Sequence, residues 1–267
     1  MTRTIRAARS ALPMQWALCA LGLAAPLLAF AELSNETLIG PGLRSRPAYD
    51  GSASQRTEAV PVVRYLGEPW FVRSTQGLLE GGLRIAVAPG LHLGAQLAYE
   101  AGRDKSESSF LKRHHVADVD RGASIGAHLE WDATVGPVPL TLLARYRKFT
   151  DTDLGAQGDV RLSAGVFRQG RAAAGVFVQS TFADERSNRA FYGIAPQVSV
   201  ITGLPAFVPG GGQRFISYGL LWSVELSRDW EVVGNLEERR LRADAAASPL
   251  AERVSNHFVS VGLAYRF

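Results

Sequence analysis

The feature of this sequence that most constrains its fold is an alternation of apolar residues with small or polar ones over stretches of about ten residues. Residues 215–226 and 257–267 show it clearly, and residues 91–100 and 123–132 repeat it. Successive side chains of a β-strand point to opposite faces, so each stretch predicts a strand with one apolar face and one small or polar face.

Two architectures use such strands: a soluble sandwich or barrel with the apolar face inside, and a transmembrane barrel with that face toward lipid. The stretches are long enough to cross a bilayer at a tilt, and aromatic residues stand near the ends of their apolar faces. The opposite face carries too many charges for a dry core. We therefore predict an all-β, antiparallel, up-and-down transmembrane β-barrel. Its candidate lumen residues are Arg145, Arg147, Arg161, Glu130, Asp132, Glu225 and Glu237.

The strand count is predicted to be about twelve. Ten is the alternative, because glycines and Pro61 blur the pattern of the first four strands. The predicted strands are 36–46, 57–66, 69–77, 80–88, 91–101, 123–134, 137–148, 157–168, 171–182, 213–227, 230–241 and 257–267.

Short and long connections alternate along the chain. Short turns are predicted near 67–68, 89–90, 136–137, 169–170 and 228–229, and long polar connections near 47–55, 102–121, 149–156, 183–212 and 242–256. In outer-membrane barrels the short turns face the periplasm and the longer loops face outward. We therefore expect both termini on the periplasmic side.

The N-terminus has the pattern of a secretory signal peptide. Arg3, Arg6 and Arg9 precede an apolar run, and Ala29-Phe30-Ala31 matches a cleavage site. Residues 1–31 are thus predicted to be removed, which leaves a barrel domain at 32–267. Removal takes away Cys19, the only cysteine, and lowers the net charge from +4 to +1. Thiol catalysis is excluded for the exported form, and the charge gives no reason to expect nucleic-acid binding.

The chain ends in Phe267, preceded by Tyr265 and Leu263 at every second position. This terminal pattern is similar to the signal that the barrel assembly machinery of Gram-negative outer membranes recognises. Together with the leader it predicts the cell outer membrane as the destination, with lipid and lipopolysaccharide as surroundings.

Several segments resemble the MipA/OmpV family of outer-membrane proteins. Residues 47–52 are similar to the family's early Pro-x-Tyr-x-Gly-Ser motif, and residues 102–104 resemble the start of a characteristic loop. The final third matches best, in residues 218–220, 244–250 and 262–267. The order of these segments along the chain, more than any one of them, supports the resemblance.

The resemblance implies an outer-membrane barrel that acts as a scaffold or interaction protein and joins a lytic transglycosylase to a murein synthase. It brings no catalytic residues. The alternatives are a narrow pore for small solutes, since twelve strands enclose less space than porins do, and a surface adhesion protein.

Enzymatic and metal-binding sites have weaker support. The histidines and acids of the longest basic loop, and His257, could serve as acid–base groups only with partners that a sequence cannot reveal. The pair His114-His115 lacks a suitably spaced third ligand, and residues 210–212 lack the strand–helix context of a phosphate loop. We predict no catalytic, cofactor-binding or metal-binding residues and no enzymatic activity. The loop residues singled out here are His114, His115, Asp118 and Asp120.

Overall fold

The computed structural model describes residues 37–75 and 77–267, and its strands form one closed antiparallel barrel. The count of twelve is confirmed and the alternative of ten is wrong. The strands are β1 (Leu38–Pro47), β2 (Gln55–Leu66), β3 (Trp70–Thr75), β4 (Leu78–Ala88), β5 (Leu91–Glu100), β6 (Gly122–Val135), β7 (Val138–Phe149), β8 (Ala156–Gln169), β9 (Ala172–Ala183), β10 (Gly212–Glu225), β11 (Trp230–Leu241) and β12 (Ser255–Arg266).

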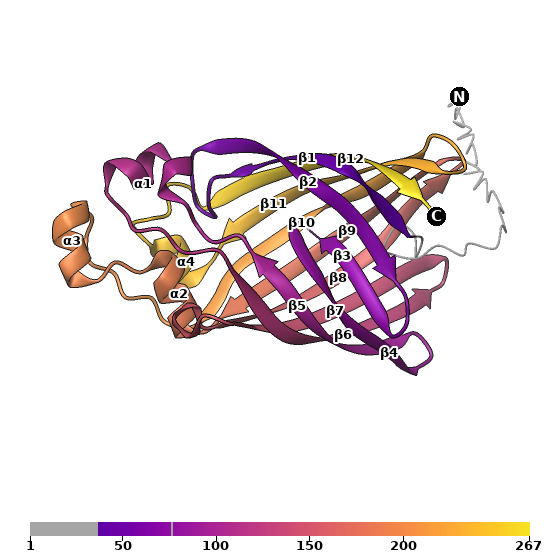
Figure 1. Ribbon diagram of the computed structural model, residues 1–267, viewed down its shortest axis with the longest axis horizontal. Coiled ribbons are helices and arrows are strands. Elements are labelled where there is room, and N and C mark those ends of the chain that lie inside the picture. The colour runs from indigo at the N-terminus through magenta and orange to yellow at the C-terminus, as the bar shows by residue number, and fades with distance from the viewer. Residues whose placement is uncertain (1–36, 76) are drawn as a thin grey trace, which may run out of the picture.

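Each strand pairs with its neighbours in sequence, and β1 pairs with β12 to close the barrel. Figure 1 shows the consequence: the helical connections gather at one end, the loop rim, and the C-terminus lies at the opposite end, the turn rim. The turn rim holds short connections and the loop rim holds the long ones, as predicted, except that the connection from Thr75 to Leu78, which joins the loop-rim ends of β3 and β4, is short. The predicted signal peptide, residues 1–31, lies outside the described residues.

The barrel exposes its apolar side chains on the outside. Leu43, Leu97 and Leu236 are 56%, 60% and 45% exposed, although each lies within a strand. Their sequence neighbours turn inward, as the alternation predicts. Such an apolar outer band suits the hydrocarbon core of a membrane.

Short helices fold over the loop rim and carry a small apolar core of their own. Tyr49, Leu111 and Leu250 are buried together there. Side chains cap four of these helices. In two of them, Ser108 accepts from the N–H of Leu111 and Asp184 accepts from the N–H of Ser187. The helices are η1 (Lys105–Glu107), α1 (Ser109–Arg113), η2 (Thr152–Leu154), α2 (Glu185–Tyr192), α3 (Pro196–Thr202) and α4 (Ala243–Ala247).

The contact between β2 and β3 is the shortest seam of the barrel. Only Arg64, Tyr65 and Leu66 of β2 have partners on β3, and the hydroxyl of Ser74 then bonds the backbone N–H of Val63 at 3.0 Å. β3 ends at Thr75, earlier than the predicted limit of 77, because the chain turns at Gly77, whose φ of +80° favours glycine. Residues 55–62 therefore have no partner strand on this side among the described residues.

Helices do not provide a membrane span in this chain. Among the described residues, none of the helices combines the length and the apolar character that crossing a bilayer requires.

Candidate functional site in the barrel lumen

The inward face of the barrel carries an arginine–carboxylate network centred on Glu80. One oxygen of Glu80 accepts from Arg73 Nε at 2.6 Å and from Arg145 Nη1 at 3.1 Å, and the other accepts from Gln96 Nε2 at 3.0 Å. All four side chains are buried. A carboxylate buried among two guanidinium groups stays ionised because both partners stabilise its charge.

Two more carboxylates extend the network. Glu130 accepts from Arg73 Nη1 at 2.7 Å and from Arg84 Nη2 at 2.8 Å. Asp159 accepts from Arg145 Nε at 2.9 Å and Nη2 at 2.8 Å. The charges thus connect β3, β4, β6, β7 and β8, which we call the network side of the lumen. Removing one member of such a network leaves an uncompensated buried charge.

The seven predicted lumen residues do not form one cluster. Arg145 and Glu130 belong to the network, and Arg147 lies at its edge, 3.5 Å from Glu100. Arg161 stacks on the ring of Phe177 at 4.1 Å, and Glu237 pairs with Arg239 at 3.0 Å.

The other two predicted residues lie toward the turn rim. Asp132 accepts from the hydroxyl of Thr141 at 2.6 Å, and Glu225 pairs with Arg266 at 3.3 Å. The sequence reasoning missed four central members of the lumen: Arg73, Glu80, Asp159 and Arg239. They stand at inward positions of strands, so extending the alternation through β3, β4, β8 and β11 would have found them.

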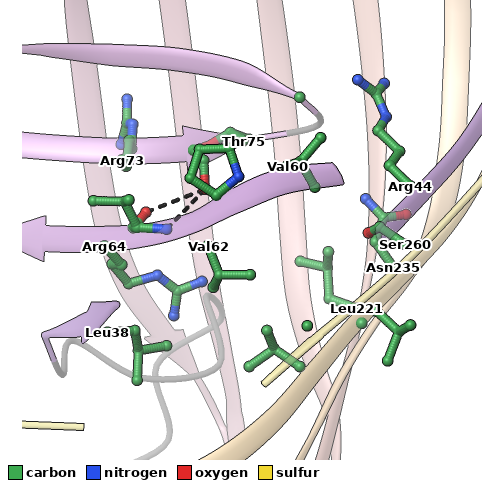
Figure 2. Close-up of a pocket in the computed structure, with 18 of the residues that line it drawn as sticks. Leu38, Arg44, Val60, Val62, Arg64, Arg73, Thr75, Leu221, Asn235 and Ser260 are labelled. Carbon is green, nitrogen blue, oxygen red and sulfur yellow. Dashed lines mark hydrogen bonds between the residues drawn. The ribbon is translucent and has the colours of Figure 1, made fainter. Parts of the chain in front are cut away.

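The opposite part of the lumen, bounded mainly by β1, β2, β10, β11 and β12, is hollow, and we call it the hollow side. Arg73 and Arg145 of the network also line its two cavities. An inner cavity of about 140 Å³ lies there, lined by inward residues such as Val62, Leu221 and Asn235. Figure 2 shows these side chains around the cavity, with Arg44 at one end. An outer cavity of about 220 Å³ lies nearer the loop rim. Both cavities are lined by Arg44 and Phe258, so they meet at these residues.

The loop rim covers the outer cavity and is held by buried polar contacts. The Tyr49 hydroxyl donates to the carbonyl of Leu250 at 2.9 Å, and Asn256 bonds both Gly51 and Ser52. Burial raises the pKa of Tyr49, so its hydroxyl remains a donor. The Pro-x-Tyr-x-Gly-Ser segment therefore has a structural role here: it packs the first loop onto the last.

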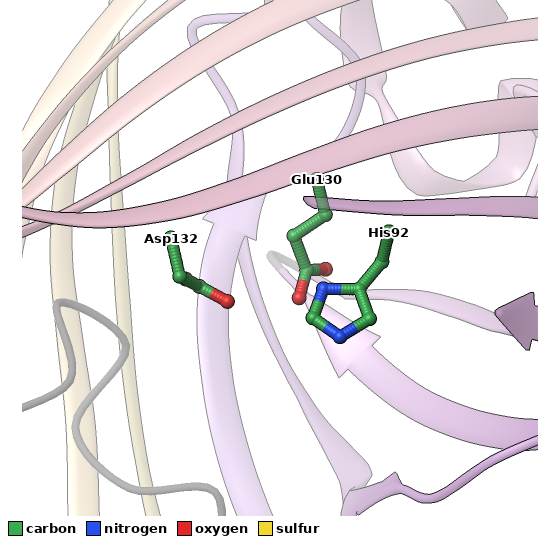
Figure 3. Close-up of side chains that lie close together, drawn as sticks. All are labelled: His92, Glu130 and Asp132. Atoms are coloured by element: carbon green, nitrogen blue, oxygen red, sulfur yellow. The ribbon is translucent and has the colours of Figure 1, made fainter. Parts of the chain in front are cut away.

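Three potential metal ligands lie close together near the turn rim, as Figure 3 shows: His92, Glu130 and Asp132. Both oxygens of Glu130 already accept from Arg73 and Arg84. A cation would have to compete with two guanidinium groups for this carboxylate, and we assign no metal site to the cluster.

The histidines of the long loop make packing contacts. His114 Nδ1 lies 2.8 Å from the carbonyl oxygen of Thr202, and its ring packs against Phe110. His114 thereby links the loop of α1 to that of α3. Among the described residues, these contacts place neither an acid nor a nucleophile beside the ring.

The end of the chain forms an aromatic cluster at the turn rim. Tyr265 packs edge-on against Trp230, with ring centroids 5.3 Å apart, and against Phe267 at 4.9 Å. Phe267 is 76% exposed, and Leu263 is also exposed on the outer surface. The predicted assembly signal thus lies on the lipid-facing side of β12.

Solved structures of outer-membrane barrels resemble the fold only loosely. An outer-membrane channel from Pseudomonas putida F1 matches with a TM-score of 0.48 and 10% identity, over 92% of this chain and all of that chain. The translocator domain of autotransporter NalP from Neisseria meningitidis gives 0.46 and 14%, over 88% and 89%. LpxR from Salmonella typhimurium gives 0.44 and 9%, over 85% and 100%. No functional inference rests on such low similarity.

A comparison with curated proteins found no match. A family model does match: the one described as MltA-interacting protein MipA covers residues 39–267, which is nearly the whole described barrel. The closed barrel, its apolar outer surface and this match identify an outer-membrane β-barrel. The chain belongs to the MltA-interacting protein MipA family.

Proposed function

We propose that this barrel is a non-enzymatic docking protein that holds a murein-degrading lytic transglycosylase at the inner face of the outer membrane. The observation that carries the proposal is the family match over residues 39–267, because the description of that family names an interaction with MltA. A murein synthase is the second partner of the proposed scaffold.

The structure supports a rigid platform. The buried charge network ties five strands together across the lumen. At the turn rim the connections are short, for example Gly136 and Pro137 between β6 and β7. A stiff rim with short turns presents a fixed surface to a periplasmic partner, which lowers the entropic cost of binding.

Co-purification tests the docking role. The immobilised full-length barrel, solubilised in detergent, is mixed with a purified lytic transglycosylase from the same cells. We expect retention by the wild type and loss after a short Gly-Ser insertion between Gly136 and Pro137. The matched control is the same insertion between Gly203 and Leu204, at the loop rim. No retention by the wild type, or equal loss from both insertions, contradicts the proposal.

A narrow pore is the second candidate, because the inner and outer cavities meet at Arg44 and Phe258. Planar-bilayer recording distinguishes it from a pure scaffold. Single-channel steps that grow in Phe258→Ala support a passage on the hollow side, whereas silence in both proteins argues against it.

The positions of the loop rim and of β12 point to two further partners of the barrel. The loop rim faces lipopolysaccharide in the proposed orientation, and β12 with Leu263, Tyr265 and Phe267 is the segment we propose for the assembly machinery. Deleting Phe267 tests the latter: accumulation of heat-modifiable barrel in the outer membrane should fall sharply.

A further inference from the structure

The inner cavity has an apolar wall and a charged end. Val60 and Val62 of β2, together with Leu221 and Val233 of β10 and β11, line it as half-buried side chains. Arg44 of β1 lies where this cavity meets the outer one. Arg64, Arg73 and Arg161 line the cavity as well; Arg73 is neutralised by Glu80 and Glu130, and Arg161 stacks on Phe177. Space bounded by aliphatic groups and by guanidinium groups suits an amphiphilic anion.

Arg44 differs from the arginines of the network. Among the described residues it makes no hydrogen bond and no ion pair; its guanidinium lies over the ring of Phe258, with Cζ 5.2 Å from the centroid. Of the nearby acids, Glu58 pairs with Arg46, and Glu237 pairs with Arg239 through Oε1 while its Oε2 is buried without a hydrogen-bond partner in the described part of the chain. A guanidinium whose five donors make no hydrogen bond offers a site for an anion.

The size of the cavity limits the ligand. A volume of about 140 Å³ is close to that of the engineered apolar cavity of about 150 Å³ that binds benzene. The apolar part of the ligand is therefore one aromatic ring or a short alkyl chain. The anionic group extends past this volume toward Arg44 and the outer cavity.

A second charge on the ligand would be unfavourable. Glu231 lines the same cavity, and its Oε2 is buried without a hydrogen-bond partner among the described residues. A carboxylate placed near Glu231 would meet a like charge in a poorly solvated setting. The two glutamates that line the cavity, Glu231 and Glu237, thus disfavour a second anionic group beside them.

We propose that the inner cavity binds a small monocarboxylate with an apolar body, either an aryl group or a short alkyl chain, whose carboxylate pairs with Arg44. This assignment is independent of any murein enzyme at the turn rim. It also does not require conduction, because a ligand can enter the inner cavity from the outer one and leave by the same route.

Calorimetric titration of the detergent-solubilised full-length barrel tests the site, with benzoate as the probe. Benzyl alcohol is its neutral counterpart and terephthalate its dianionic one. We expect the wild type to bind benzoate about tenfold or more tightly than either. Equal binding of benzyl alcohol, or no binding of benzoate, overturns the proposal.

Two substitutions locate the charge that is responsible. Arg44→Gln should weaken benzoate binding about tenfold or more, and Arg44→Lys should restore part of it. Arg147→Gln is the matched control, because Arg147 lines only the outer cavity. Equal weakening by Arg44→Gln and Arg147→Gln would show general luminal attraction and overturn the assignment.

A third substitution tests the cavity itself while Arg44 stays in place. Leu221→Phe should fill the inner cavity and reduce benzoate binding, since the aryl group loses its space. Heat-modifiable migration on gels confirms that each variant is folded. Unchanged benzoate affinity in folded Leu221→Phe would place the ligand elsewhere.

Discussion

The two sides of the lumen differ in how far their inward side chains fill the interior. On the network side, long charged side chains such as Arg73, Glu80 and Arg145 reach across the interior and neutralise one another. On the hollow side, inward positions hold short residues, among them Gly42, Gly262 and Ser260, and space remains. The side-chain length at inward positions therefore decides whether a barrel of this size is filled or hollow.

This difference also assigns rigidity to the network side and ligand binding to the hollow side. Each carboxylate of the network already pairs with at least one guanidinium group, so the network side is suited to hold the wall in shape. Arg44 on the hollow side has no such partner among the described residues, and Glu231 is similarly unpaired. Matched substitutions on the two sides test this division.

The largest difference in stability is expected between two variants that each remove one buried glutamate, Glu80 on the network side and Glu231 on the hollow side. Glu80→Ala leaves Arg73 and Arg145 without a shared acceptor and should lower the free energy of unfolding by about 3–5 kcal/mol. Glu231→Ala removes a buried carboxylate that lacks a partner for Oε2, so stability should change little or rise. Urea unfolding in detergent measures both. Similar losses from the two variants would remove the distinction between the sides.

The next effect compares two adjacent leucines of β10. Leu220 lies on the outer face, opposite Leu236 and Val176, so Leu220→Arg should cost about 2–4 kcal/mol near the bilayer midplane. Leu221 faces the inner cavity, which also contains Glu231 and Glu237, and Leu221→Arg should cost much less. The measured quantity is the yield of heat-modifiable protein in the outer membrane. Equal loss would mean that the cavity is dry and closed to charge.

A smaller effect is expected from adding one methyl group on each side. In Gly94→Ala the new Cβ would meet the backbone oxygen of Leu83 and the ring of His128, so overpacking should cost about 1–3 kcal/mol. In Gly262→Ala the nearest obstacle is the side chain of Val62, which can shift toward the cavity. The second variant should therefore be the more stable in urea. A reversed order would show that the hollow side is the more tightly packed.

The alternation of residue types was enough to predict the barrel, because one apolar face must meet lipid along every strand. It left the strand count between twelve and ten, because glycines and Pro61 blur the first four strands. It could not predict where β3 ends, since that depends on the turn at Gly77 and on the Ser74–Val63 contact. The alternation also marked Arg145 and Glu130 as luminal, but it did not show that Arg145 bonds Glu80 or that Glu130 bonds Arg73. Pairing across strands depends on register and tilt, which a single sequence does not contain.

The cavity of the hollow side could not be predicted from the sequence for a related reason. Arg44 looks the same in sequence as Arg46, two residues along β1, yet only Arg46 has a carboxylate partner, Glu58. A cavity results from the sum of many side-chain volumes around a closed sheet, and no local pattern records that sum. The MipA/OmpV resemblance, in contrast, was recognisable because it depends on the order of motifs, and the family match confirmed it.

The smallest effect concerns how the loop rim is fastened above each side. Next to the short β2–β3 seam, Glu107 pairs with Arg46 and Arg56, which are all partly exposed. The loop of α2 is instead held by buried Arg214, whose guanidinium donates to Ser187 and Asn188.

Salt screens exposed pairs more than buried ones, and exposed pairs contribute at most about 1 kcal/mol. We therefore expect trypsin to cut loop 101–121, at Lys112 and Arg113, up to about fivefold faster in high salt. Cleavage of loop 184–211 at Arg186 in the same digest serves as the internal reference and should keep its rate; Arg189 is left out because salt also screens its exposed pair with Glu185. Glu107→Gln should reproduce the effect of salt at low ionic strength. If both loops respond equally, the two rims are fastened alike, and the contrast between the sides is confined to the lumen.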